Sequence, residues 1–143
     1  DSVASRGLGD VYKRQQESLE LMNWAMQRSS ETFKTPVCIA ICDANGELLL
    51  FSRMDEAPAR TINIAQAKAY TAARMSMSTI SFKERLERES LATSDFMDDK
   101  LCSLPGGVPL LKDGKTVAAV GISGLSLEND HALASLIAQQ FIT

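Results

Sequence analysis

The chain has 143 residues, a formal net charge of −3 at pH 7 and a hydrophobic fraction of 45%, which is enough for one domain with a buried core. Its mildly acidic balance argues against nucleic acid or an anionic membrane as the main partner, and no run approaches the roughly 18 apolar residues that a membrane helix needs. We therefore expect neither a nucleic-acid partner nor a membrane span, and we expect the protein to act in the cytoplasm.

The first residues differ in character from the rest of the chain. The segment from Ser5 to Gln15 resembles the in-frame translation of a transposase sequencing adapter, and it contains two glycines and no apolar period. Remnants of this kind lie outside fold reasoning. We interpret residues 1–15 as a non-native leader and residues 16–143 as a single domain. The natural N-terminus is then expected to be missing, so the sequence is silent on a signal peptide.

The domain is predicted to begin with a helix and a strand pair. Residues 17–33 form the predicted helix, because their apolar side chains recur at helical spacing on one face. Residues 37–43 and 47–53 follow as two strands. The Asn45-Gly46 pair between the strands is a strong hairpin signal, because both residues accept a positive φ.

Two helices are predicted after the break at Pro58. The first, over residues 61–75, carries small residues that allow close packing. The second, over residues 81–90, is dense in charged residues that favour a solvated face. Residues 95–103 are expected to be irregular and acidic.

A second hairpin and a helix complete the chain. Residues 108–111 and 116–122 are predicted strands joined by Asp113-Gly114, which favours a primed turn, and Pro109 places the first of them at a sheet edge or a strand start. Ser126 is expected to cap the last helix. Because helices join hairpins here, with no alternating βαβ units, the pattern predicts an α+β fold with an antiparallel sheet flanked by helices.

The three cysteines predict neither a disulfide nor a zinc site. Cys38 and Cys42 lie about 13 Å apart along one predicted strand, well beyond bridging distance, and Cys102 lies in a loop. A single distant histidine does not complete a four-ligand zinc set. We expect three reduced thiols, two in the core and one near the surface.

The usual signatures of catalysis are absent from the sequence. There is no G-x-S-x-G elbow, no phosphate-binding glycine loop and no carboxylate–histidine metal motif. Ser123 in the segment GISG could be considered as a nucleophile, but only one histidine exists to act as its base. We interpret Ser123 as a small residue that lets the strand turn into the helix.

Three segments in register carry a resemblance to a known family. They are residues 43–48 with 53–58 (DANGEL and RMDEAP), residues 64–72 (IAQAKAYTA) and residues 104–124 (LPGGVPLLKDGKTVAAVGISG). Together they resemble the GlcG/HbpS/PduO-C-type haem-binding-like proteins, and the resemblance extends over about residues 17–141.

This resemblance implies a PAS- or profilin-like sheet with flanking helices, a bacterial-type protein and a homo-oligomer. It also implies a small-molecule ligand, with haem or a related tetrapyrrole or carboxylate as the expected cofactor. Two alternatives stay open: an enzyme or enzyme accessory in haem degradation or corrinoid metabolism, and a ligand-free assembly module. Haem-binding members use a histidine in the N-terminal part of the domain, and this sequence has none there.

His131 is the one imidazole of the chain and the predicted iron ligand. It lies in the first turn of the last helix, where the helix dipole disfavours the protonated ring. Met75 and Met77 are the second choice, because thioethers also ligate haem. The alternatives are a histidine without a ligand and methionines that fill the core.

A last group of residues suggests a pocket for an anion. Arg53 ends an apolar strand and Lys68 interrupts an alanine-rich face, and charges in such places tend to be paired or to bind an anion. The functional interpretation is a pocket for propionates or another carboxylate, formed by Arg53, Asp55, Lys68, Gly106, Gly107, Ser123 and Asp130. The structural alternative is an ion pair, Arg53–Asp55 or Lys68–Asp130. A pocket of fixed donors with few acid–base groups suits binding better than turnover.

Overall fold

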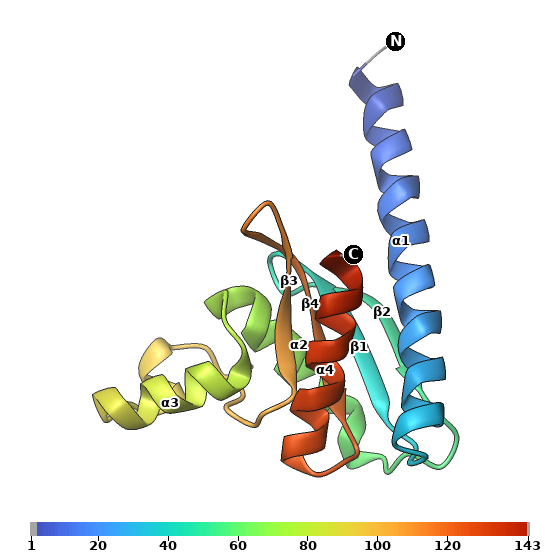
Figure 1. The fold of residues 1–143 in the computed structure, drawn as a ribbon. Coiled ribbons are helices and arrows are strands. Elements are labelled where there is room, and N and C mark those ends of the chain that lie inside the picture. Colours follow the sequence, from blue (N-terminus) through green and yellow to red (C-terminus); the bar gives the residue numbers. More distant parts are fainter. Residues whose placement is uncertain (1–2, 143) are drawn as a thin grey trace.

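A four-stranded antiparallel sheet forms the centre of the computed structural model, which describes the backbone of residues 3–142 and the side chains of residues 15–141. The sheet lies between helices (Figure 1). Its strands follow the order β2-β1-β4-β3, and they are β1 (Cys38–Asp43), β2 (Leu48–Arg53), β3 (Gly107–Lys112) and β4 (Lys115–Ser123).

Helices cover both faces of this sheet. In Figure 1, α1 and α4 lie in front of the sheet, α2 lies behind it, and α3 extends to the side beyond β3. The helices are α1 (Val3–Thr32), α2 (Arg60–Met75), α3 (Thr79–Glu89) and α4 (Leu127–Ile142), with a short 3-10 helix, η1, at Thr93–Phe96. The architecture confirms the predicted α+β fold with an antiparallel sheet.

The predicted elements agree with the observed bounds to within about two residues, except at the start of α1. This helix begins at Val3, although the sequence pattern starts it at residue 17. A helix that is anchored at one end propagates at little cost per residue, so the loss of an apolar period does not end it. The interpretation of residues 1–15 as a non-native leader concerns their origin and stays a prediction, and residues 1–2 lie outside the described part.

Both predicted hairpin turns form. Asp113 and Gly114 have φ values of 53° and 77°, which is the pair of positive angles that a primed two-residue turn requires. At the other hairpin, Asp43 accepts hydrogen bonds from the backbone N–H groups of Asn45 and Glu47, and Gly46 has a φ of 92°. Pro109 lies in β3, which is an edge strand as predicted.

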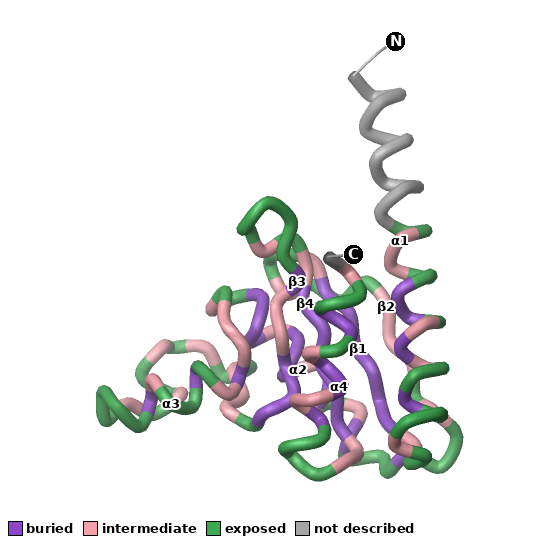
Figure 2. Tube along the Cα trace, in the orientation of Figure 1, coloured by how far each residue is buried: buried purple, intermediate pink, exposed green. Residues whose placement is uncertain are grey.

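The two faces of the sheet differ in side-chain size. Toward α1 and α4 the sheet presents bulky residues such as Ile39 and Ile41, which pack with Leu133 of α4. Burial of each such side chain contributes about 1.5–3 kcal/mol. Figure 2 shows that β1 and much of β4 are buried.

Toward α2 the buried residues of the sheet are small, although the partly buried Phe51 of β2 also packs there. Cys38, Ala40, Cys42 and Ala119 pack against the buried alanines of α2. At Gly121 a Cβ atom would overlap the carbonyl oxygen of Ala65, so the approach of α2 to β4 requires glycine there. The small residues that predicted close packing of this helix do allow it.

The cysteines and the helix cap are as expected. All three cysteines are free, with Cys38 and Cys42 buried and Cys102 half-buried. The Ser126 hydroxyl accepts a hydrogen bond from the backbone N–H of Asn129 at 3.1 Å. Within the described range, no helix is long and apolar enough to cross a membrane.

Candidate functional site

Lys68 is a charged residue of α2 that lies fully buried. Its ammonium donates to Oδ2 of Asp130 at 3.0 Å and to the carbonyl oxygen of Ile122 at 2.8 Å. Asp130 is 1% exposed, and its Oδ1 accepts the backbone N–H of Leu125 at 2.9 Å. The Lys68–Asp130 ion pair, which the sequence left as the structural alternative, is therefore present and ties α2 to α4.

The glycine corner before β3 closes over this ion pair. Gly106 has a φ of 130°, and a Cβ there would lie 2.7 Å from the Ile122 carbonyl oxygen and 2.8 Å from Nζ of Lys68. At Gly107 a Cβ would overlap the carbonyl oxygen of Lys68, and the Gly107 N–H donates to Oγ1 of Thr79 at 2.9 Å. The amide of Gly107 is thus engaged within the protein.

Burial controls the electrostatics of the pair. It raises the pKa of the Asp130 carboxyl above its ordinary value, and the nearby Lys68 ammonium only partly opposes this effect. Taking two charges out of water costs several kcal/mol per ion, and attraction and hydrogen bonds must offset that cost. The pair therefore works as a unit, and the loss of either partner leaves the other charge buried without its counter-ion.

The remaining residues of the predicted anion pocket lie apart from the pair. Arg53, which is exposed, donates from Nε and Nη2 to the carbonyl oxygen of Ala57 at 3.0 and 2.8 Å. Asp55 is exposed in the turn that follows β2. The structure brings Lys68, Gly106, Gly107, Ser123 and Asp130 together and leaves Arg53 and Asp55 at the end of β2. That these seven residues bind a ligand stays a prediction.

His131 is half-buried on α4. Its Nδ1 is buried and has no hydrogen-bond partner, and its Nε2 lies 3.3 Å from the hydroxyl of Ser135. Met75 and Met77, the second choice for an iron ligand, are half-buried at the end of α2. In the described part of the chain, no group of three or more His, Cys, Asp or Glu residues could hold a metal ion.

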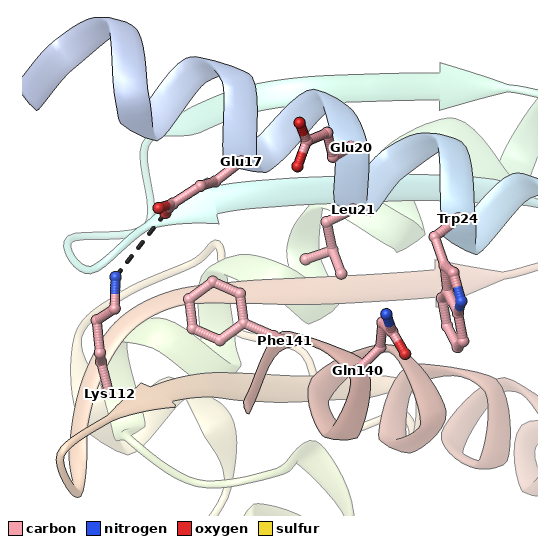
Figure 3. A pocket seen from close by; sticks show the side chains of 7 residues that line it. All are labelled: Glu17, Glu20, Leu21, Trp24, Lys112, Gln140 and Phe141. Atoms are coloured by element: carbon pink, nitrogen blue, oxygen red, sulfur yellow. Dashed lines mark ion pairs between the residues drawn. The ribbon is translucent and has the colours of Figure 1, made fainter. Parts of the chain in front are cut away.

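A cavity of ≈ 380 Å³ lies between α1, α4 and the end of β3. Figure 3 shows Leu21 of α1 pointing toward Phe141 of α4, Trp24 of α1 opposite Gln140, and Lys112 of β3 pointing toward Glu17. The Lys112 ammonium lies 3.8 Å from the Glu17 carboxylate and 6.0 Å from the centre of the Phe141 ring. The complete lining is Glu17, Glu20, Leu21, Trp24, Lys112, Gln140 and Phe141.

This α1–β3–α4 cavity combines aromatic walls with a cation at its rim. Its volume lies in the lower part of the range of about 300–1,000 Å³ that small-molecule sites have. The exposed ion pair at the rim holds Lys112 weakly, so a ligand carboxylate can replace Glu17 as its partner. The sequence patterns did not predict this cavity, although Glu17, Leu21 and Trp24 are spaced along one helix face and form its α1 wall.

The chain matches the family model described as "Haem degrading protein HbpS-like" over residues 14–139. It is 36% identical to Protein GlcG of Escherichia coli (strain K12) over 110 residues, which are 76% of this chain and 71% of GlcG. It is 31% identical to the corrinoid adenosyltransferase PduO of Citrobacter freundii over 121 residues. These are 83% of this chain and 36% of PduO, so the chain spans about a third of that relative.

The fold is also that of a solved haem complex. The crystal structure of a PduOC:Heme complex superposes with a TM-score of 0.78 and 27% sequence identity, covering 90% of this chain and 93% of that chain.

Proposed function

The chain belongs to the HbpS-like family, and on that basis we propose that it binds haem or a related tetrapyrrole that carries carboxylates. The observation that carries this proposal is the likeness to PduOC, whose structure contains haem. We assign the ligand to the α1–β3–α4 cavity, because its walls and its charge suit a flat apolar ring with an acidic edge.

The lining residues fit the ring and one carboxylate of such a ligand. Trp24 and Phe141 offer aromatic faces for stacking. Lys112 offers an ammonium for a propionate, and since Glu17 and Glu20 carry the opposite charge, one propionate is matched and the other points to solvent. At ≈ 380 Å³ the cavity encloses one edge of the macrocycle.

The lining residues do not supply an imidazole to an iron ion. His131 is not among them, and its Nδ1 is buried. The sequence-based prediction that His131 ligates the iron stays a proposal, and it requires Nε2 to give up its contact with Ser135. Bound haem would supply a redox-active iron, and the role of this chain's residues is to hold the ring and its carboxylate.

The test is a titration of the full chain with haemin and, in parallel, with metal-free protoporphyrin IX, each followed by its absorption band. We expect saturable binding of both at about one per chain. Trp24→Ala and Lys112→Met should each weaken binding roughly 3- to 10-fold, because stacking and a rim charge contribute about 1 kcal/mol each. Lys115→Met, at the exposed start of β4, is the matched control.

A haemin titration that is indistinguishable from free haemin would refute the proposal. His131→Ala separates the two modes of binding. If His131 ligates the iron, this variant loses affinity for haemin and keeps its affinity for protoporphyrin IX. An unchanged haemin spectrum would rule out His131.

The family description favours haem degradation as a second candidate function. Degradation predicts that the absorption band of bound haem decays when ascorbate or peroxide is added. A band that persists under conditions where free haemin is stable would leave binding as the function.

We also propose that the protein forms a homo-oligomer. The edge strand β2 carries Leu48 and Leu49, each 48% exposed, and exposed apolar edge strands tend to pair with another chain. Native mass spectrometry measures the assembly directly, and a monomer at micromolar concentration would contradict this proposal.

A further inference from the structure

A second cavity lies on the other face of the sheet, against α2. It has a volume of ≈ 380 Å³ and is bounded by the turn between β1 and β2, the outer side of α2 and residues 99–101. The α1–β3–α4 cavity lies on the side of α1 and α4, so the two cavities are separated by the sheet. A ligand in this α2 cavity is therefore independent of the proposed tetrapyrrole.

Tyr70 forms a rigid wall of the α2 cavity. Its hydroxyl donates to Oδ2 of Asp98 at 2.6 Å, and Oδ1 of Asp98 accepts the backbone N–H of Lys100 at 3.1 Å. Gly46 lies so close that a Cβ there would be 2.6 Å from the ring. The ring and the loop that carries Lys100 are thus held in place before any ligand arrives.

The floor of the α2 cavity is apolar and uncharged. Ala67 and Leu101 contribute alkyl groups, and Cys42 contributes a buried thiol that donates to the carbonyl oxygen of Ala69. Burial raises the pKa of the Cys42 thiol to about 12, so no thiolate forms there near neutral pH. This floor suits a small aliphatic group.

The rim of the α2 cavity carries charges of both signs. The Glu47 carboxylate comes from the β1–β2 turn, and the Lys100 ammonium comes from residues 99–101, where it lies 5.6 Å from the centre of the Tyr70 ring. Within the described residues, no ion pair occupies either of them. Asp99 beside Lys100 adds a second carboxylate to the rim, so the rim offers partners to an ammonium group as well as to a carboxylate.

Hydrogen-bonding groups on α2 line the same cavity as these charges. Asn63 and Gln66 share one side of the helix and both line the cavity. The Nε2 of Gln66 donates to the carbonyl oxygen of Ile62 at 3.1 Å, which leaves its Oε1 as an acceptor for an ammonium group. We propose that the α2 cavity binds a small zwitterion, an α-amino acid with an aliphatic side chain. Its ammonium faces Glu47 and Gln66, and its carboxylate faces Lys100.

Three probes with the same aliphatic body test this proposal. L-leucine carries both charges, 3-methylbutylamine lacks the carboxylate, and 4-methylpentanoate lacks the amine. Each is titrated into the full ¹⁵N-labelled chain and followed by amide chemical shifts. We expect L-leucine to saturate with shifts confined to residues 46–48, 63–70 and 99–101, and to bind at least about tenfold more tightly than either analogue, since each charge contact is worth about 1.4 kcal/mol or more.

Variants at the rim and the floor give the controls. Lys100→Met and Glu47→Gln change exposed side chains, and each should lower the affinity for L-leucine about tenfold. Ala67→Leu places bulk in the cavity and should abolish binding. Lys83→Met, on the exposed side of α3, should leave it unchanged. All four variants should bind haemin with the affinity of the unmodified chain. The haemin titration therefore separates a failure of the amino-acid proposal from a failure of the tetrapyrrole proposal.

Two results would overturn the proposal. The first is the absence of shifts at the α2 cavity with L-leucine, or shifts there that survive Ala67→Leu. The second is 4-methylpentanoate or 3-methylbutylamine binding as tightly as L-leucine, because the rim would then not recognise a zwitterion.

Discussion

We expect Lys68→Met to destabilise the fold by about 3 kcal/mol, because it leaves a buried carboxylate without its cation. Removal of one partner of a buried ion pair costs about 3–5 kcal/mol. The lower end applies here, since Asp130 keeps the N–H of Leu125 at 2.9 Å and the Met side chain fills the space of the Lys stem. In a domain of this size, 3 kcal/mol corresponds to a fall in Tm of roughly 6–12 °C.

The assay is urea unfolding without ligand, followed by the fluorescence of Trp24, the single tryptophan. The control is Arg85→Met, which breaks an exposed pair with Glu89 and should change the free energy of unfolding by less than about 0.5 kcal/mol. The double variant Lys68→Met/Asp130→Asn removes both charges, so it should be more stable than the sum of the two single losses predicts, by about 2 kcal/mol.

Two outcomes would refute this reasoning. A loss below about 1 kcal/mol for Lys68→Met would mean that the ion pair contributes little. Strict additivity in the double variant would mean that the two side chains are not coupled. A variant that unfolds like the unmodified chain and yet loses affinity for haemin would instead support the anion pocket predicted from the sequence.

Two further predictions concern the glycine corner and the thiols. Gly106→Ala should lower the free energy of unfolding in urea by at least about 2 kcal/mol, because both the φ of 130° and the near contacts at this position disfavour a Cβ atom. Gly114→Ala has open space around it and should cost only about 1 kcal/mol. Equal losses for the two variants would contradict this explanation. Alkylation at pH 8 should label Cys102 in the native protein and reach Cys38 and Cys42 only after unfolding, since the latter two are buried and the pKa of Cys42 is raised to about 12. Fast native labelling of three thiols, measured by mass, would show that the core opens.

Local signals in the sequence were sufficient for most of the fold. The Asp113-Gly114 turn depends on two residues and their own φ values, and Pro109 marks an edge strand because it cannot donate to a ladder. Alanines on one side of a helix indicate close packing wherever that helix docks. Each of these inferences needed only neighbours in the sequence, which is why the element bounds could be predicted.

The sites depend on residues that are distant in the sequence, so the sequence could name candidate residues and could not show how they come together. Trp24 and Phe141 come to line one cavity only after α1 and α4 dock on the same face of the sheet. Arg53 donates a hydrogen bond to the carbonyl oxygen of Ala57. Every residue has such a carbonyl group, so the identity of Ala57 does not predict this contact. From the sequence, the Lys68–Asp130 ion pair could only be given as an alternative to an anion pocket. The sequence does not show which charged side chains come together in the core.

The unequal faces of the sheet have a consequence for how the protein tolerates change. On the side of α1 and α4, residues such as Ile39 and Ile41 can exchange with other aliphatic residues at modest cost. On the side of α2, the space between the sheet and the helix at Ala40 and Ala119 has no room for a larger side chain, so an added methyl group would push α2 outward. Because α2 also carries Lys68 and the wall of the α2 cavity, such a push would disturb both. A saturation scan would therefore find one side of the sheet permissive and the other nearly closed to substitution.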